Sequence, residues 1–203
     1  MKGAGRVAGL TGLALSVLLT GCAGLSGPDG DALAAYQQRA EQVASLKGWR
    51  MQGRIAMQRD GEGGQLRVSL SAFADGGHRL QVRNTFGQTV MVLATTESGP
   101  VLRDARGRTY TGEAARAELE RRLGGRVPLD RFARWAGGVG PADSPPSAVD
   151  DRGRPGAVAS GPWSVTYGDY RRVEGIWLPS QVTVQYIGFQ MRLLVDRWSL
   201  RWS

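Results

Sequence analysis

The sequence predicts a mainly β, α+β fold in which an antiparallel sheet curls into an incomplete barrel and carries an inserted helical lid. Three observations support this fold class. Apolar and polar residues alternate with a period of two in many short segments, which is typical of half-buried strands. Two segments in the middle of the chain have helical periodicity instead. The connections between the strands are too short for the crossovers that parallel strands need.

The N-terminal segment predicts export. Positive charges at Lys2 and Arg6 precede an apolar run over residues 10–19, which is typical of a signal peptide. This run is about half the roughly twenty residues that a membrane-spanning helix needs. It ends in Leu19-Thr20-Gly21-Cys22, which resembles the lipobox of bacterial lipoproteins. We therefore predict a signal peptide over residues 1–21 and a lipid anchor on Cys22.

Two alternatives remain for Cys22, a chance cysteine after an ordinary signal and a buried structural cysteine. Because it is the only cysteine in the chain, no intramolecular disulfide can form. Residues 22–31 contain glycine, serine and proline without periodicity, so we expect a lipidated tether there. Residues 32–203 are expected to form one domain, because this length is enough for a single sizeable core.

The chain is basic. Loss of Lys2 and Arg6 with the signal peptide lowers the formal charge from +8 to +6. This charge favours an acidic partner or an anionic membrane surface. We expect no nucleic-acid partner, because the arginines are scattered along alternating strands and the chain is predicted to be exported. Only Lys2 and Lys47 are lysines. We attribute the arginine excess to genomic base composition.

The first half of the domain begins with a helix. Apolar residues at three- and four-residue steps predict this helix over 32–46, namely Leu33, Tyr36, Ala40, Val43 and Leu46. Alternation then predicts four strands over 49–58, 65–70, 79–83 and 89–95, with glycine-containing turns between them. Their order indicates an antiparallel meander. Two shorter strands are expected over 100–104 and 108–111.

The second half begins with two short helices over residues 113–123 and 129–136, and Gly124-Gly125 stops the first of them. A loop is expected from there to Pro162, followed by strands over 163–167, 181–186 and 191–202. The helices could cap the open end of the sheet, cross its concave face or form a separate unit. A separate unit would have too little core. We expect a lid over an incomplete barrel.

The inward positions of the strands are candidates for the lining of a cavity. They are Met51, Ile55, Met57, Leu66, Val68, Leu70, Leu80, Val82, Val90 and Val92. The candidate inner face of the lid consists of Leu119, Leu123, Phe132 and Trp135. The same pattern also fits a solid core, which is the usual purpose of such a face.

No catalytic motif emerges from the sequence. His78 is the sole histidine, so a histidine metal cluster is excluded, and we expect it at the surface or at a sheet edge. There is no Gly-x-Ser-x-Gly elbow and no phosphate-binding loop. We therefore expect no enzyme, metal or cofactor. Two rival hypotheses remain, a lipoprotein that uses its sheet as a docking surface and a hydrolase that uses His78.

An ordered set of short motifs resembles the LolB family of outer-membrane lipoprotein receptors. After the lipobox, the set comprises residues 49–56, 84–89, 127–129, 135–141, 163–167 with Tyr170, 178–179 and 193–198. The resemblance implies an unclosed antiparallel barrel with a helical lid over an apolar cavity. It also implies a periplasm-facing monomer anchored in the outer membrane through Cys22. The implied partners are a LolA-type periplasmic carrier, the acyl chains of cargo lipoproteins and outer-membrane phospholipid.

The resemblance also singles out one loop. In the family, an exposed leucine in an Asn-Pro-Leu-Gly loop delivers cargo into the membrane, and the matching residues here are Asn84-Thr85-Phe86-Gly87. Phe86 takes the place of the leucine and Thr85 replaces the proline, so the large apolar tip is kept. We expect Phe86, flanked by Thr85 and Gly87, to enter lipid. The alternative is that Phe86 folds back onto the core.

Overall fold

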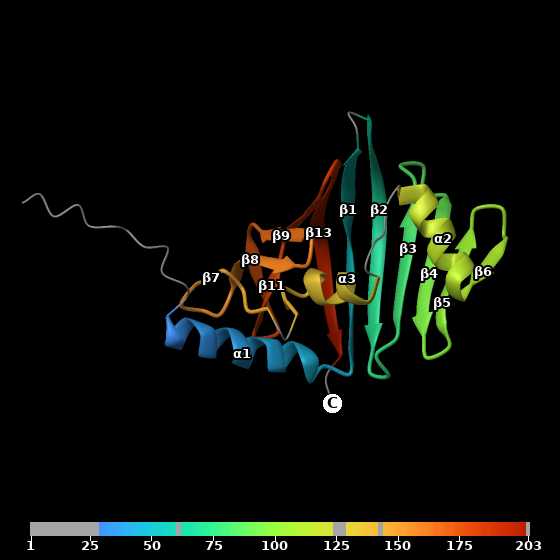
Figure 1. Ribbon diagram of the computed structural model, residues 1–203. Helices are drawn as coiled ribbons and strands as arrows, with labels where there is room; N and C mark the ends of the chain where they lie inside the picture. The colour runs from blue at the N-terminus through green and yellow to red at the C-terminus, as the bar shows by residue number, and fades with distance from the viewer. Residues whose placement is uncertain (1–28, 60–61, 124–128, 142–143, 202–203) are drawn as a thin grey trace, which may run out of the picture.

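One large antiparallel sheet dominates the computed structural model, which describes residues 29–59, 62–123, 129–141 and 144–201 (Figure 1). Within these residues the sheet has eleven strands. They are β1 (Gly48–Arg59), β2 (Glu62–Phe73), β3 (His78–Arg83), β4 (Thr89–Thr96), β5 (Gly99–Asp104), β6 (Thr109–Thr111), β7 (Ala148–Val149), β8 (Pro155–Ser160), β9 (Trp163–Tyr167), β12 (Gln181–Tyr186) and β13 (Phe189–Arg201).

The order of the strands leaves the barrel open. It runs β6-β5-β4-β3-β2-β1-β13-β12-β9-β8-β7, so the edge strands β6 and β7 do not pair with each other. Neighbouring strands are antiparallel. The predicted fold class, an incomplete antiparallel barrel, is confirmed.

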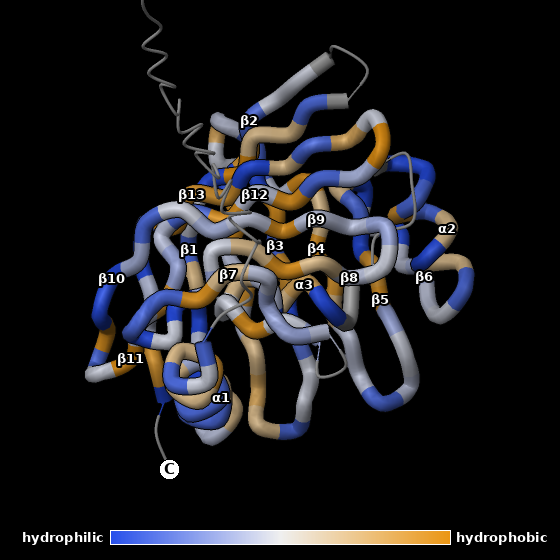
Figure 2. The backbone as a smooth tube through the Cα atoms, turned by 60° about the vertical axis from the view of Figure 1, so that its left-hand side comes forward, coloured by the Kyte–Doolittle hydropathy of each residue, from blue (hydrophilic) through white to orange (hydrophobic). Residues whose placement is uncertain are grey.

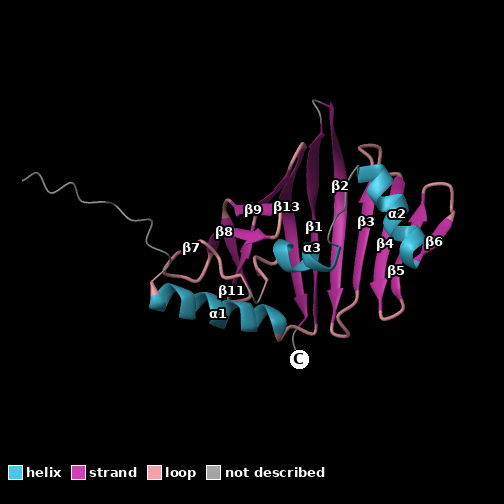
Figure 3. Cartoon of the chain, viewed as in Figure 1, coloured by secondary structure: helices cyan, strands magenta, loops and turns pink. Residues whose placement is uncertain are grey.

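Three helices and a small hairpin complete the described fold. They are α1 (Gly30–Ala44), α2 (Gly112–Leu123), α3 (Leu129–Ala136) and the hairpin of β10 (Tyr170–Val173) with β11 (Ile176–Pro179). Helices α2 and α3 lie over one face of the sheet, while α1 runs along one end of it (Figure 3). Hydropathy alternates along several of the strands (Figure 2). Buried apolar residues of these strands form one core cluster with residues of α2 and α3.

A β-bulge bends the centre of the sheet. The register between β1 and β13 shifts between Gln52 and Gly53. A Cβ atom at Gly53 would lie 2.3 Å from the carbonyl oxygen of Leu194, so only glycine allows β13 to approach this closely. Bulges of this kind increase the local bend and twist of a strand. Gly53 therefore helps the sheet curl around its apolar face.

Most predicted elements were confirmed, with three corrections, and the first is that the hairpin of β10 and β11 was not predicted, because each of its strands has only four residues. Helix α1 begins at Gly30, two residues before the predicted start, because the side chain of Asp29 caps it by accepting a hydrogen bond from the Ala32 amide at 2.9 Å. The predicted loop up to Pro162 was wrong over β7 and β8. These strands were missed because they are short and contain proline, glycine and alanine, which weaken the strand signal.

Candidate functional site

An apolar cavity of about 260 Å³ lies between the sheet and the helices α2 and α3. Most of its lining is aliphatic or aromatic, and three polar side chains, His78, Thr95 and Arg122, join it. The apolar lining residues are Ile55, Met57, Leu66, Val68, Leu70, Leu80, Val82, Val90, Met91, Leu93, Leu119, Phe132, Ala133, Trp135, Trp163, Val184, Phe189 and Met191. The face is therefore not a completely filled core.

The structure brings most of the predicted lining residues together. Ile55, Met57, Leu66, Val68, Leu70, Leu80, Val82 and Val90 all line the cavity. Met51 does not, because it is fully buried in the packed core beyond the cavity. The inward positions of β1 therefore have two roles. Near the start of the strand they belong to the packed core, and near its end they line the cavity.

The prediction for Val92 was wrong. The register between β3 and β4 shifts after Val82, which pairs with Met91 while Arg83 pairs with Thr89. The shift inserts Val90 as an extra residue, so Met91 and Leu93 take the inward positions of β4. Val92 instead lines a shallow groove on the outer face. Simple alternation from Val90 cannot reveal a bulge.

Several lining residues were missed by sequence reasoning. Besides Met91 and Leu93 they include Thr95, Trp163, Val184, Phe189 and Met191 on the strands, and Arg122 and Ala133 on the helices. Trp163, Val184 and Met191 lie on strands that alternation did predict, so the strand signal was present. The missing information was how far the sheet curls, which brings β9, β12 and β13 to the same cavity as β1–β4.

The helices cover the cavity through the predicted apolar side chains. Leu119 of α2 and both Phe132 and Trp135 of α3 line it. Trp135 is 1% exposed, and its ring centroid lies 6.0 Å from that of Trp163. The side chain of Leu123 lies outside the described residues. For the described residues of α2 and α3, the predicted lid is confirmed, and it lies over the apolar face of the sheet.

His78, which was expected at the surface or at a sheet edge, is the first residue of β3. It is half-buried and lines the cavity, where its Nδ1 lies 3.3 Å from the hydroxyl oxygen of Thr95. Burial lowers the pKa of His78, while the charge of Asp75 opposes this effect. The imidazole is therefore neutral near pH 7 and adds a weakly polar group to the apolar lining.

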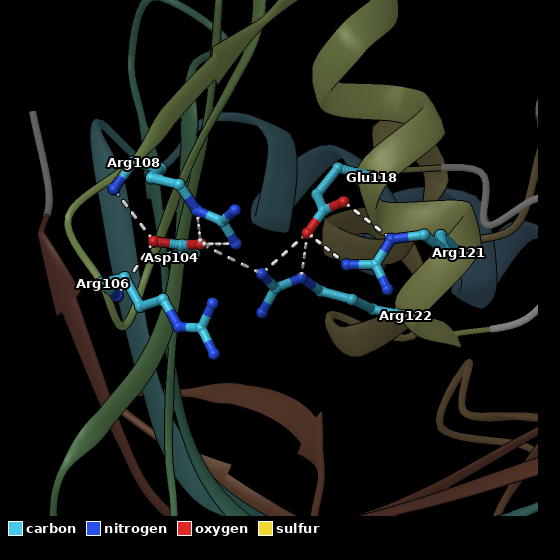
Figure 4. Close-up of polar contacts among 6 residues, drawn as sticks. All are labelled: Asp104, Arg106, Arg108, Glu118, Arg121 and Arg122. Atoms are coloured by element: carbon cyan, nitrogen blue, oxygen red, sulfur yellow. Dashed lines mark hydrogen bonds and ion pairs between the residues drawn. The ribbon is translucent and has the colours of Figure 1, made fainter.

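Charged hydrogen bonds tie α2 to the end of β5 (Figure 4). The Arg122 side chain lies 2.7 Å from Glu118 and 3.4 Å from Asp104, so it joins the two carboxylates. Hydrogen bonds from Arg121 and Arg122 lower the pKa of Glu118 to about 2. Burial alone would raise the pKa of Asp104, but hydrogen bonds from Arg108 lower it below its ordinary value. Both carboxylates are ionised at neutral pH.

A buried arginine holds the end of α3. Arg39 of α1 is 3% exposed and donates to the carbonyl oxygens of Gly137 at 3.1 Å, Gly153 at 2.8 Å and Trp177 at 3.2 Å, and also to that of Gly138. Burial lowers the pKa of Arg39. A guanidinium stays protonated in proteins, so these carbonyls receive charged hydrogen bonds. The end of α3 is thereby joined to α1.

The turn between β3 and β4 presents Phe86 to solvent. Phe86 is 88% exposed, so the alternative in which it folds back onto the core was wrong. The amide of Gly87 donates to the Asn84 carbonyl, and the amide of Gln88 donates to the Asn84 side chain, both at 3.0 Å. Gly87 has a φ of 83°, which favours glycine. Asn84 thus closes the turn without the family's proline.

Within residues 29–59, 62–123, 129–141 and 144–201, no group of histidine, cysteine and acidic side chains could hold a metal ion. Across the same residues, no helix is both long and apolar enough to span a bilayer. The distinguishing feature of the site is a cavity whose lining is almost entirely apolar. Fold and site together define a class of protein, the unclosed antiparallel barrels that enclose an apolar cavity beneath helices.

Comparisons with known proteins place the chain within this class. A LolA superfamily protein from Nitrosomonas europaea has a similar fold, with a TM-score of 0.55 and 12% identity over 82% of this chain and 93% of that chain. The family model described as outer membrane lipoprotein LolB matches residues 47–198. The chain therefore belongs to the LolB family.

Curated relatives are similar to this chain along nearly its whole length. The outer-membrane lipoprotein LolB of Halorhodospira halophila is 28% identical over 193 residues, which cover 94% of each chain. The protein of the same name from Aeromonas hydrophila is 26% identical and covers 91% of this chain and 92% of its own. The similarity is thus spread over the sheet and the helices alike.

Proposed function

We propose that this chain accepts acylated lipoproteins from a LolA-type periplasmic carrier and inserts them into the outer membrane. The observation that carries this proposal is the apolar cavity beneath α2 and α3, which matches the chemistry of fatty acyl chains. Membership of the LolB family supports the same function. The chain acts as a binding protein in this proposal, without a catalytic group or a cofactor.

The energetics explain why such a cavity is needed. Burial of one methylene contributes about 0.8 kcal/mol, so roughly forty methylenes of a triacylated lipoprotein would cost on the order of 30 kcal/mol to expose to water. Transfer between two apolar cavities keeps this burial nearly constant. Modest differences in affinity then set the direction of transfer, and no nucleotide is required at this step.

Phe86 supplies the membrane contact in this proposal. Its ring stands away from the domain on a turn closed by hydrogen bonds, so it can enter lipid without unfolding the sheet. Thr85 and Gly87 flank it and set its direction. An aromatic ring on a rigid turn loses little conformational entropy when it is buried.

The anchor completes the proposal. Residues 1–21 form the signal peptide and the acyl groups are attached to Cys22, which lies outside the described residues. Residues 22–29 then connect the membrane to α1, and the single domain works as a periplasm-facing monomer. A lipid anchor of two or three chains gives stable attachment.

A transfer assay tests the proposed function. Purified carrier loaded with an acylated lipoprotein is mixed with the chain carrying Cys22→Ala, and the cargo on each protein is quantified after separation. We expect most of the cargo to move to the chain. A chain that takes no cargo would contradict the proposal and favour a lipoprotein that only uses its sheet for docking. Retained transfer in His78→Ala would separate the proposal from a hydrolase that depends on His78.

A further inference from the structure

The outer face of the sheet, opposite the cavity, carries a strongly basic groove formed by β1, β2, β3 and β13. Five arginines and one aspartate line it, together with uncharged residues. The charged lining residues are Arg50, Arg67, Arg79, Arg83, Arg197 and Asp196. We call this surface the outer arginine groove. It is independent of the cavity, which lies beneath the helices on the other face.

Strand register places like charges directly opposite one another in this groove and at its border. Arg54 on β1 faces Arg67 on β2, and Arg67 in turn faces Arg83 on β3. Like charges that face each other across strands destabilise a sheet. The chain nevertheless keeps three arginines in a row, which suggests that a ligand compensates for the repulsion.

The protein supplies little opposite charge of its own. Arg54 pairs with Asp196 at 3.0 Å, and Arg83 donates to the amide oxygen of Gln81 at 3.4 Å. In the part of the chain that the structure describes, Arg67 has no carboxylate partner. The groove can therefore accept negative charge from outside, and guanidinium groups suit phosphate because they donate two parallel hydrogen bonds.

The position of the groove favours a membrane as the source of that phosphate. Arg83 is the last residue of β3, and the exposed Phe86 follows three residues later, within about 10 Å along the chain. Leu194, which faces Arg54, is 37% exposed on the same outer side. Apolar groups of interfacial proteins enter roughly 5–10 Å below the headgroups. With Phe86 at that depth, Arg83 lies at the level of the phosphates.

We propose that the outer arginine groove binds the phosphates of anionic phospholipid headgroups and sets the orientation in which Phe86 meets the bilayer. This inference deepens the proposed function and rests on its membrane step. An acidic protein surface, such as that of the carrier, is the competing occupant. The row of arginines beside an apolar tip favours lipid, because a protein partner would leave Phe86 without a role in the contact.

Vesicle binding without cargo or carrier tests the groove. The chain carrying Cys22→Ala, which cannot be acylated, is sedimented with vesicles of phosphatidylcholine alone or mixed with phosphatidylglycerol. We expect clear preference for the anionic vesicles and about thirtyfold weaker binding to them by Arg67→Gln/Arg83→Gln, since each arginine near an anionic surface contributes about five- to sixfold. The difference should shrink as salt is added.

A matched control separates the groove from net charge. Arg116→Gln/Arg172→Gln removes the same two charges from exposed positions on α2 and β10, and less than a twofold loss is expected. Equal losses in the two double variants would overturn the proposal, because binding would then depend only on net charge. The melting temperature of Arg67→Gln/Arg83→Gln is compared with that of the chain with an intact groove. An equal or higher value verifies that the variant is folded.

Cargo transfer from the carrier, measured without vesicles, tests whether the groove binds the carrier instead of lipid. We expect Arg67→Gln/Arg83→Gln to receive cargo normally. Loss of this transfer with unchanged vesicle binding would show that the groove docks the carrier, and the proposal would be wrong. Failure of the proposed function gives a different result from failure of the groove proposal. In that case the chain with an intact groove takes no cargo from the carrier, whether or not it binds vesicles.

Discussion

Substitution of Phe86 by glutamate separates membrane delivery from cargo uptake. The ring is 88% exposed, so the fold loses almost no buried contact and the free energy of unfolding should change by less than about 0.5 kcal/mol. Burial of a phenylalanine side chain in an apolar medium contributes about 2–3 kcal/mol. Loss of this contribution weakens the lipid contact roughly 30- to 150-fold, and the carboxylate adds a charge that lipid excludes.

The assay follows cargo in two steps, from the carrier to the chain and from the chain into liposomes. We expect Phe86→Glu to keep the first step and to slow the second at least 30-fold, while Phe86→Leu, which restores the family's residue, keeps both. Phe73→Glu is the matched control. Phe73 is an aromatic residue that is 47% exposed, and it lies beside the start of β3, whereas Phe86 follows the end of β3. Unimpaired insertion by Phe86→Glu would refute the reasoning, as would an equal loss in Phe73→Glu.

Three further substitutions test the cavity and the attachments of the helices. Leu80→Trp fills the cavity at a cost to folding of about 1–3 kcal/mol, so the folded variant should take up less cargo, and undiminished uptake would contradict a role for the cavity. Arg39→Met leaves buried carbonyls without a donor, which should cost about 3–5 kcal/mol and lower the melting temperature by about 10 °C, and an unchanged melting curve would contradict this role. The pKa of Glu118 is depressed to about 2, so its stabilisation is complete above its ordinary pKa and is lost as the pH falls from about 4.5 towards 2. Glu118→Gln should therefore flatten the dependence of melting temperature on pH in that window, whereas parallel curves would count against a stabilising role for the pairs of Glu118 with Arg121 and Arg122.

The main features of the fold could be predicted because they depend on local patterns. Alternation along β1–β4 identifies strands in any antiparallel sheet, and helical periodicity identifies α2 and α3 in the middle of the chain. Strands β7 and β8 could not be predicted. Ala157 and Ala159 give little contrast between their two faces, and Pro155 removes one hydrogen-bond donor. The pairing of these strands depends on β9, whose position the sequence does not specify.

The site shows a similar division. Alternation predicted which side of each strand is apolar, so Ile55, Val68 and Leu80 were correctly assigned to the lining. It could not locate the register shift after Val82, and Val92 was therefore assigned to the wrong face. The same limit affected the arginines. Their scatter along the sequence suggested base composition, whereas strand pairing brings Arg67 and Arg83 directly together.

The size of the cavity requires movement of the helices during uptake. A dry cavity of about 150 Å³ holds one benzene molecule, so about 260 Å³ holds roughly ten carbon atoms, fewer than one long acyl chain contains. Charged hydrogen bonds attach both helices to the rest of the fold. Helix α2 is tied to β5 through Arg122, whose partners Glu118 and Asp104 are both buried. The end of α3 is held by the buried Arg39, whose hydrogen bonds are costly to break. Both helices are therefore held by charged hydrogen bonds to buried groups, and a movement that admits a longer acyl chain has to break one of these two attachments.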